Sequence, residues 1–354
     1  MKTLSDALVQ RVLKGLQKDF GERGQVSIMG EGRFTAEPKE WIPSGLRLLD
    51  LAIGNGLPVG KVIEIFGSEV TGKSALCASI IGQAQKAGAV TALMDAEEAW
   101  SRDFIKKMGK ADPDLVYYFD PDTLEDMWMG VELFIDSVRK CEQERPILIV
   151  VDSLAGLPTM EEEDTPLDEA TSMASGARIN RKAIRKLKKK IAMERAIVVC
   201  TNHTTADPGK TWGDKTTTPG GGGPRFFSSL RIKQDHIGHI LDGEKQRIGQ
   251  KLESLVFKSR WDGAGKKIIY PLYFTHGIDD MESQVDFLYR RGVFGSEKGW
   301  VVWADKKMRA KDLAVLARTD AEVAAQIDKL LVEHFRGGRP AVGETDPEEV
   351  AGAV

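Results

Sequence analysis

Residues 67–74 read GSEVTGKS, and this short segment limits the possible folds more than any other part of the chain. An apolar run, residues 62–66, precedes it, and a helix-like segment begins at Ala75. A strand, a glycine-containing loop and a helix in this order are typical of a phosphate-binding loop, in which backbone N–H groups surround phosphate oxygens. The alternative is a glycine turn without chemical consequence. We predict a nucleotide site formed by Gly67, Ser68, Glu69, Val70, Thr71, Gly72, Lys73, Ser74 and Ala75.

Two side chains of this loop have expected roles of their own. The ammonium group of Lys73 would reach the β- and γ-phosphates, and the hydroxyl of Ser74 would hold Mg²⁺. The sequence therefore predicts a nucleoside triphosphate and Mg²⁺ as ligands.

The whole chain has 354 residues, of which 42% are hydrophobic, and this suits one large α/β domain with small additions. No apolar run approaches the roughly 18 residues of a membrane span, and the N-terminal segment lacks the apolar core of a signal peptide. We therefore expect a cytoplasmic protein without a membrane partner. The net charge of −3 argues against a uniformly basic surface but allows a local basic stripe.

Carboxylates follow two of the predicted strands. Glu97 and Glu98 come after residues 89–94, and Asp152 comes after the five apolar residues 147–151. In open α/β sheets the ligand lies outside the carboxyl ends of the strands, so these groups should face the nucleotide. We predict that Glu97 activates the attacking water, with Glu98 a solvated charge, and that Asp152 supports Mg²⁺.

A third buried strand, residues 196–200, leads into a polar trio that ends in His203. At a strand end beside the nucleotide, such a trio can report the γ-phosphate to the segment that follows. The alternative is a structural turn.

Two later stretches predict a polyanion-binding surface. Residues 161–169 hold six carboxylates and are expected to form a loop, whereas residues 178–190 hold eight bases. At 100° per residue the bases gather on one helix face, opposite an apolar face. The basic positions of that face are Arg178, Arg181, Lys182, Arg185 and Lys189. The alternative is an exposed face with no ligand.

The second stretch, residues 204–224, is rich in Gly and Thr and has no periodicity. Trp212 lies between two lysines, and a glycine run includes Gly220 and Gly221. Glycine amides can meet phosphates and an aromatic ring can stack on bases, so we expect a long loop that is ordered by a ligand.

The ends of the chain carry smaller elements. Residues 4–20 have helical apolar spacing, and the apolar face could pack on its own domain or on a neighbouring subunit. We predict an N-terminal helix and strand (1–35), a core with the nucleotide and polyanion sites (36–280), a small C-terminal α/β domain (281–336) and an acidic disordered tail (337–354).

Several strings together resemble the RecA class of recombinases, over nearly the whole chain up to about residue 310. They are KDFG, SIMGEG, LDLAIGNGLPVGKVIEIFGSEVTGKS, MDAEEA and LIVVDSLAGLP, followed by the segment 202–226. Three details, NHT at 202–204, GGGGP at 220–224 and KSR at 258–260, are more similar to the UvsX branch of phage recombinases than to bacterial RecA. The resemblance implies a RecA-like P-loop core, a mostly parallel twisted sheet flanked by helices.

The resemblance also implies roles around ATP. Glu97 would activate water, Lys73 and Ser74 would contact phosphate and Mg²⁺, and Asp152 would be the strand-end aspartate. His203 stands where bacterial RecA has a γ-phosphate-sensing glutamine. Phe104 matches an aromatic residue that stacks on adenine, although Ser101 replaces the aspartate that accompanies it.

For DNA, Arg178 and Arg185 match family contact positions, and Trp212, Gly220 and Gly221 match an aromatic and two phosphate-contacting glycines. Arg225 supplies charge, with Lys210 and Lys215, to a loop whose family basic positions are Thr205 and Asp207 here. Lys258 and Arg260 match a pair that crosses to the neighbour's ATP, and Phe226 matches an interface residue.

We therefore predict an ATP-dependent strand-exchange protein that forms helical filaments on single-stranded DNA and pairs it with homologous duplex. Single-strand-binding and loader proteins are possible partners. One alternative is a hexameric helicase, although only about 60 residues precede the phosphate loop. The other is a single-strand-coating protein with little ATP turnover, against which Glu97 and Asp152 both count.

Overall fold

The computed structural model describes residues 6–20, 26, 38–166, 168–169, 174–206, 216–218, 222–261, 263–294 and 300–337. It divides into two units, residues 1–39 and the remainder from Glu40 onward. Trp212, Gly220 and Gly221 lie outside the described residues, as do residues 338–354 of the predicted tail 337–354, whose first residue Gly337 ends a helix.

The first unit contains the helix α1 (Asp6–Phe20), which confirms the predicted N-terminal helix. Leu8, Val12, Leu16 and Phe20 lie along its apolar face with exposed fractions of 46–52%. Within its unit this face is therefore not buried.

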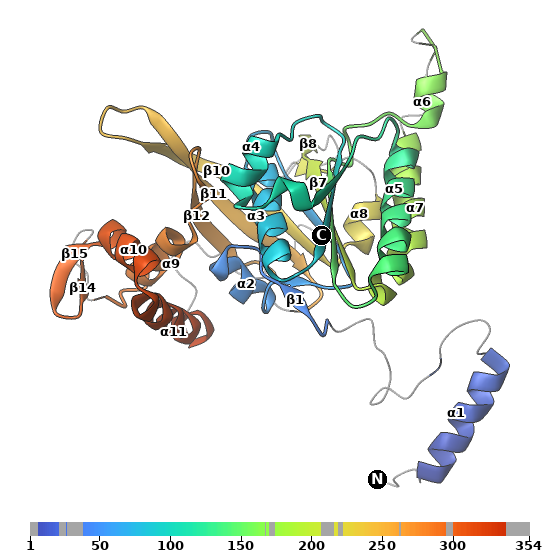
Figure 1. The fold of residues 1–354 in the computed structure, drawn as a ribbon, viewed down its shortest axis with the longest axis horizontal. Coiled ribbons are helices and arrows are strands. Elements are labelled where there is room, and N and C mark those ends of the chain that lie inside the picture. The colour runs from blue at the N-terminus through green and yellow to red at the C-terminus, as the bar shows by residue number, and fades with distance from the viewer. Residues whose placement is uncertain are drawn as a thin grey trace. The chain divides into compact units, whose positions relative to one another are not determined.

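The second unit is built on a large, mostly parallel sheet, which confirms the predicted α/β fold (Figure 1). From β10 to β5 neighbouring strands are parallel, and β10 to β13 are antiparallel. The described strands are, in spatial order, β13 (Gly277–Ile278), β12 (Lys267–Tyr273), β11 (Arg247–Ser259), β10 (Leu230–Leu241), β3 (Val62–Gly67), β7 (Ala196–His203), β6 (Ile147–Asp152), β4 (Val90–Asp95) and β5 (Val116–Phe119).

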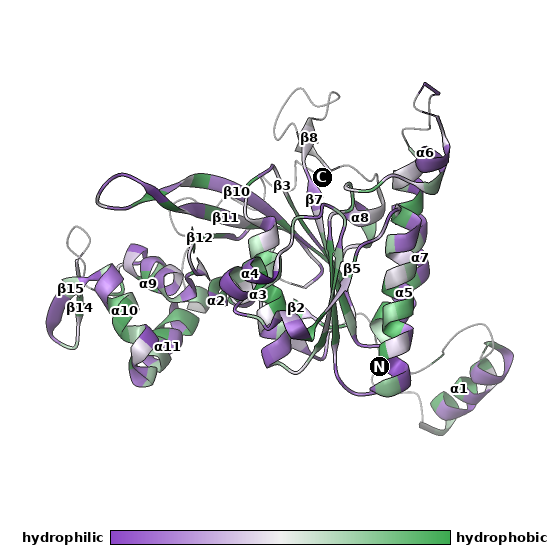
Figure 2. Ribbon diagram, turned by 45° about the horizontal axis from the view of Figure 1, so that its top comes forward, coloured by the Kyte–Doolittle hydropathy of each residue, from purple (hydrophilic) through white to green (hydrophobic). Residues whose placement is uncertain are grey.

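Helices cover both faces of this sheet. Helix α3 (Lys73–Lys86) packs on one face, where Ile63 and Ile65 belong to its core. Helices α5 (Leu124–Cys141) and α7 (Ser175–Met193) lie together on the other face, and Trp128 Nε1 of α5 donates to Asn180 Oδ1 of α7 at 2.8 Å. Figure 2 shows that the inner strands are hydrophobic, as expected for a parallel sheet buried on both faces.

The antiparallel part of the sheet is longer than predicted. The sequence indicated strands at 228–233 and 252–258, but β10 and β11 extend as one long hairpin that projects from the body of the unit (Figure 1). Most side chains near its turn are exposed and polar, as the purple ribbon of Figure 2 shows. An apolar pattern therefore could not reveal this extension.

Two predicted loops contain regular structure. Residues 160–164 form the short helix α6 (Met160–Asp164), because Thr159 accepts from the Glu162 N–H at 3.1 Å and Glu162 accepts from the Thr159 N–H at 2.8 Å. The segment 204–224 contains the paired strands β8 (Thr205–Ala206) and β9 (Thr216–Thr217), and its last residues begin α8 (Gly222–Phe227).

The described part of the chain after residue 280 is helical, apart from one hairpin and its connections. Helix α9 (Asp280–Arg290) and the C-terminal helices are tied to α2 (Arg47–Ile53), since Arg47 N–H donates to Asp280 at 2.8 Å and Arg47 Nε lies 2.6 Å from Asp328 Oδ1. The predicted strand near 299–303 and helix at 321–335 are confirmed, whereas β15 and α10 are additional. These elements are β14 (Trp300–Trp303), β15 (Lys306–Arg309), α10 (Ala310–Thr319) and α11 (Ala321–Gly337).

The remaining described elements are short. They are β1 (Trp41–Ile42), β2 (Leu57–Pro58), α4 (Arg102–Phe104), the π-helical turn η1 (Ile105–Gly109) and the 3₁₀ turn η2 (Pro113–Leu115). Among the helices that the structure describes, none has the length and apolar character needed to cross a bilayer.

Candidate nucleotide and DNA site

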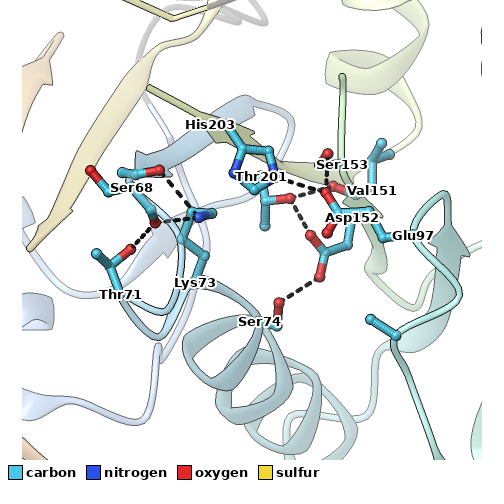
Figure 3. Close-up of polar contacts among 12 residues, drawn as sticks. Ser68, Thr71, Lys73, Ser74, Glu97, Val151, Asp152, Ser153, Thr201 and His203 are labelled. Carbon is cyan, nitrogen blue, oxygen red and sulfur yellow. Dashed lines mark hydrogen bonds and ion pairs between the residues drawn. The ribbon is translucent and has the colours of Figure 1, made fainter. Parts of the chain in front are cut away.

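The parallel register brings the predicted strand-end residues to one edge of the sheet. Gly67 pairs with His203, Val151 pairs with Cys200, and Asp95 pairs with Asp152. Because all four strands run in the same direction, the side chains that follow them point out at the same edge. The loop, the two carboxylates and the histidine therefore meet as the sequence predicts (Figure 3).

The phosphate loop depends on its two glycines. Gly72 has φ +78°, a left-handed conformation that favours glycine, and it leads directly into α3. A Cβ atom on Gly67 would lie 2.2 Å from the backbone oxygen of Gln234. Thr71 Oγ1 donates to Ser68 O at 2.8 Å and closes the turn. The loop thus presents backbone N–H groups at a helix N-terminus, the arrangement that binds phosphate.

Lys73 is folded onto this loop. Its side chain is buried, and its Nζ donates to Ser68 O at 2.8 Å and to Gly67 O at 3.2 Å. Burial lowers the pKa of Lys73, while the nearby carboxylates of Asp152 and Glu97 oppose this effect. Phosphate oxygens would replace neutral carbonyls as partners and would favour the charged ammonium.

Asp152 is the centre of the polar contacts. Ser74 Oγ donates to Asp152 Oδ2 at 2.7 Å, and Trp100 Nε1 donates to the same oxygen at 2.8 Å. Thr201 donates to the other carboxylate oxygen. A hydroxyl and a carboxylate in contact are suitable oxygen donors for Mg²⁺, so the residues present fit the expected metal. Sequence reasoning missed Trp100 and gave no role in metal support to Thr201.

Glu97 lies across the site from Lys73. Ser153 Oγ donates to Glu97 Oε1 at 2.5 Å, and His203 Nε2 lies 2.9 Å from the same oxygen. Partial burial raises the pKa of Glu97, but the hydrogen bonds from Ser153 and His203 and the charges nearby outweigh it, so the pKa lies below its ordinary value. The carboxylate is therefore ionised near neutral pH, as a base that accepts a proton from water must be.

A cavity of about 390 Å³ lies beside the phosphate loop. Its polar lining includes Lys73, Ser74, Glu97, Asp152 and His203. Its lining also includes the apolar side chains of Phe104, Met108, Leu272 and Phe274, which suit the flat face of a base. Ser101 accepts from the Phe104 N–H at 3.0 Å and caps α4. Phe104 thus lines the cavity, while the Ser101 hydroxyl caps the helix.

Lys258 and Arg260 lie elsewhere. Lys258 pairs with Arg231, which pairs with Glu64, three residues before Gly67. At 3.3 Å per residue the Lys258 backbone is roughly 10 Å from the loop along the strands. Its Nζ instead donates to Arg225 O at 2.9 Å and Phe226 O at 3.3 Å at the end of α8. Neither cation lines the cavity of its own chain.

The predicted basic face is present on α7. Ile184, Leu187 and Ile191 are buried, while Arg178, Arg181, Lys182, Arg185 and Lys189 are exposed, which confirms the predicted division of the helix. Arg178 lies 3.9 Å from Glu161, and the described residues contain no ion pair of Arg181 or Arg185. A Cβ atom on Gly223 would lie 2.8 Å from Arg181 Cα, so α8, with exposed Arg225, packs closely on this helix.

The comparisons with known proteins agree with this geometry. A family model described as the RecA N-terminal domain matches residues 7–279. Protein RecA of Thermus thermophilus is 30% identical over 344 residues, which cover 96% of this chain and 98% of that protein. Protein RecA of Thermus aquaticus is 31% identical over 347 residues, 96% and 98% of the two chains. A mitochondrial DNA repair protein recA homolog of Dictyostelium discoideum is 30% identical over 346 residues, 96% and 74% of the two chains.

The chain belongs to the RecA family. It is a DNA recombination and strand-exchange protein, and its enzymatic activity is DNA-dependent ATP hydrolysis. RecA proteins bind ATP with Mg²⁺ and form filaments on DNA. This assignment favours the recombinase over the helicase and the coating protein.

We expect Ser153→Ala to shift the pH dependence of ATP hydrolysis by this RecA-family protein. Loss of the Ser153 hydrogen bond removes one of the contacts that lower the pKa of Glu97, so the carboxylate becomes protonated at a higher pH. The acidic limb of the rate profile, measured with single-stranded DNA, should move to higher pH. Ser283→Ala, which removes a hydroxyl that donates to Ile269 O far from the site, should leave the limb in place. An acidic limb that stays in place or moves to lower pH in Ser153→Ala would contradict this assignment of Glu97.

We expect Arg185→Ala to weaken single-stranded DNA binding through loss of a phosphate contact. The slope of log K against log salt should fall by about 0.7–1, the contribution of one phosphate contact. Lys190→Ala is the matched control on the same helix, because Lys190 Nζ lies 2.7 Å from Asp136 and 3.4 Å from Glu132. Salt titrations by fluorescence anisotropy give both slopes, and equal slopes for Arg185→Ala and the unchanged protein would exclude the contact.

Proposed function

We propose that each ATP lies between two copies of this chain in a helical filament on single-stranded DNA. The observation that carries this proposal is the separation described above: the cavity contains Lys73 and Glu97, whereas Lys258 and Arg260 lie toward the opposite end of the same strands. Cations near the γ-phosphate stabilise the charge of the transition state. A neighbouring copy would supply them.

Within one chain we assign the following roles. Glu97 accepts the proton of the attacking water, and Lys73 leaves the loop carbonyls to bind the β- and γ-phosphates. Ser74 and Asp152 hold Mg²⁺, which supplies positive charge to the phosphates when bound. His203 Nε2 lies 2.9 Å from Glu97 Oε1, so a γ-phosphate that hydrogen-bonds His203 would compete for this contact. That competition makes His203 the reporter of the nucleotide.

We place DNA on the surface formed by α7 and α8. Arg178, Arg181 and Arg185 supply charge from α7, and Arg225 supplies it from α8. Trp212, Gly220 and Gly221 belong to the segment that joins β8 to α8, and we assign them to base stacking and phosphate contact. Homologous duplex would be paired on the same filament.

We assign polymerisation to the N-terminal unit, residues 1–35. The apolar side chains along one face of α1 are each 46–52% exposed, which is a large exposed apolar surface for one helix. This face needs a partner. Strand β5 is one of the two edge strands of the described sheet. Tyr117 and Tyr118 of this strand and Leu115 just before it are 52–60% exposed. An outer strand with exposed apolar side chains is suited to pairing with another chain. We propose that α1 and its following residues dock at this edge of the next copy.

We also propose that the chain belongs to the phage-type UvsX branch and acts in the cytoplasm of a bacterial or phage-infected cell. The support is His203 at the sensor position, with NHT at 202–204, GGGGP at 220–224 and KSR at 258–260. The core at 36–280, the C-terminal domain at 281–336 and the acidic tail at 337–354 remain our proposed division.

Mixing two inactive variants tests the shared site. Lys258→Ala keeps its own phosphate loop, and Lys73→Ala keeps the cations for its neighbour. An equal mixture should recover about a quarter of the DNA-dependent ATPase rate of the unchanged protein, because about a quarter of interfaces in a randomly mixed filament combine the two intact halves. Each variant alone should be inactive.

The matched control is Lys251→Ala, on the same strand but in the projecting hairpin, which should be active by itself. If both variants alone are inactive and the mixture recovers no activity, the assignment of Lys258 to a neighbour's ATP is wrong.

A further inference from the structure

A buried ion pair lies under the phosphate loop, and the roles assigned above do not use it. Glu64 of β3 and Arg231 of β10 are 0% and 4% exposed, and Arg231 Nε lies 2.5 Å from Glu64 Oε2. The two residues are directly paired in the sheet. Charges removed from water need several good partners to be tolerated, so the other contacts of this pair are informative.

Each remaining contact leads to a different functional segment. Asn202 belongs to β7, the strand that ends in His203, and we call it the sensor strand. Asn202 Nδ2 donates to Glu64 Oε1 at 3.0 Å. A terminal nitrogen of Arg231 donates to Thr218 Oγ1 at 3.2 Å. Thr218 belongs to residues 204–224, the glycine-rich segment, and precedes its run of glycines. The guanidinium lies 4.4 Å from the ring centroid of Phe66 and 5.3 Å from that of Phe257, the residue before Lys258.

Together with the β8–β9 pairing, these contacts connect the point where the glycine-rich segment leaves the core to the point where it returns. Thr205, three residues after Asn202, pairs with Thr217 in the β8–β9 ladder. Thr218 follows Thr217 and binds Arg231, which binds Glu64, which binds Asn202. Residues 205–217 therefore leave the core and rejoin it at neighbouring positions, which these hydrogen bonds hold together. We call the linked residues Asn202, Glu64, Arg231 and Thr218 the clamp.

The nucleotide site adjoins the same set of contacts. His203 follows Asn202 and pairs with Gly67, the first residue of the phosphate loop. Ser68 Oγ and Thr204 Oγ1 are 3.2 Å apart, which joins the loop directly to the residue after His203. A movement of the phosphate loop or of His203 would therefore occur one or two residues from Asn202.

We propose that Arg231 is a positioning residue that couples nucleotide binding to DNA binding, by holding Thr218 of the glycine-rich segment to Asn202 of the sensor strand through Glu64. This inference rests on the proposed function, in which that segment binds DNA. A buried, hydrogen-bonded ion pair has a fixed geometry and cannot yield gradually, so Thr205 and Thr218, on either side of the stretch that carries Trp212, move with the sensor strand. Without the clamp, ATP and DNA would each still bind, but neither would favour the other.

Two substitutions at one position separate the hydrogen bond from packing. Thr218→Val keeps the shape of the side chain and removes the acceptor, whereas Thr218→Ser keeps the hydroxyl. The coupling is measured as the ratio of single-stranded DNA dissociation constants without and with a non-hydrolysable ATP analogue. In Thr218→Val this ratio should fall at least about fivefold, the lower range of allosteric coupling. Thr218→Ser should retain the ratio, and ATP turnover without DNA should be the same in all three proteins.

A second variant tests the guanidinium itself. Arg231→Lys keeps the positive charge beside Glu64 but lacks the planar fork that reaches Thr218 as well, so it should lose the coupling like Thr218→Val. Thr91→Val is the control for loss of a buried threonine hydroxyl, since Thr91 Oγ1 donates to Leu115 O at 2.9 Å on another strand. Its coupling ratio should be unchanged.

The outcomes distinguish the inference from the proposed function. If the unchanged protein binds DNA equally with and without the analogue, the proposed function is wrong. If it shows coupling and Thr218→Val retains it, or if Thr218→Val lowers DNA-free turnover by the same factor as DNA-stimulated turnover, the positioning role of Arg231 is wrong.

Discussion

The parallel register of β3, β7, β6 and β4 is the constraint on which the rest of the structure depends. It places Gly67 beside His203 and Asp95 beside Asp152, so that residues far apart in the sequence share one edge. A slip of one residue between two strands would turn every side chain to the opposite face. The buried apolar strands exclude such a slip, because both faces are packed against helices. The chemistry of the site is therefore held by the hydrophobic core.

At that edge the polar groups contact one another. Lys73 binds loop carbonyls, Asp152 accepts from three side chains, and Glu97 is held by Ser153 and His203. A ligand must exchange these contacts for its own, so its binding necessarily changes the groups next to the glycine-rich segment. Since Lys258 lies toward the other end of the strands, one copy does not combine all the charges. In the proposed filament, assembly and hydrolysis then depend on the same interface.

The sequence predicted those parts that depend on local pattern. The strand, loop and helix around Gly72 and the apolar strand before Asp152 could be recognised from spacing, and the rule for parallel sheets placed their ends together. The pair Glu64–Arg231 and the contact of Trp100 with Asp152 could not be predicted, because they depend on strand order. The helix α6 was not predicted, although Thr159 and Glu162 have the spacing of a capping box. The helix α5 was not predicted because its segment contains no functional motif that drew attention to it.

The central claim is that ATP joins adjacent copies and that this junction arranges the DNA-binding segments. Electron microscopy of the full chain with single-stranded DNA and a non-hydrolysable ATP analogue tests it most directly. The account predicts helical filaments in which the analogue contacts Lys73 of one copy and Lys258 of the next. Closed rings, or single copies that bind both ligands without association, would contradict it.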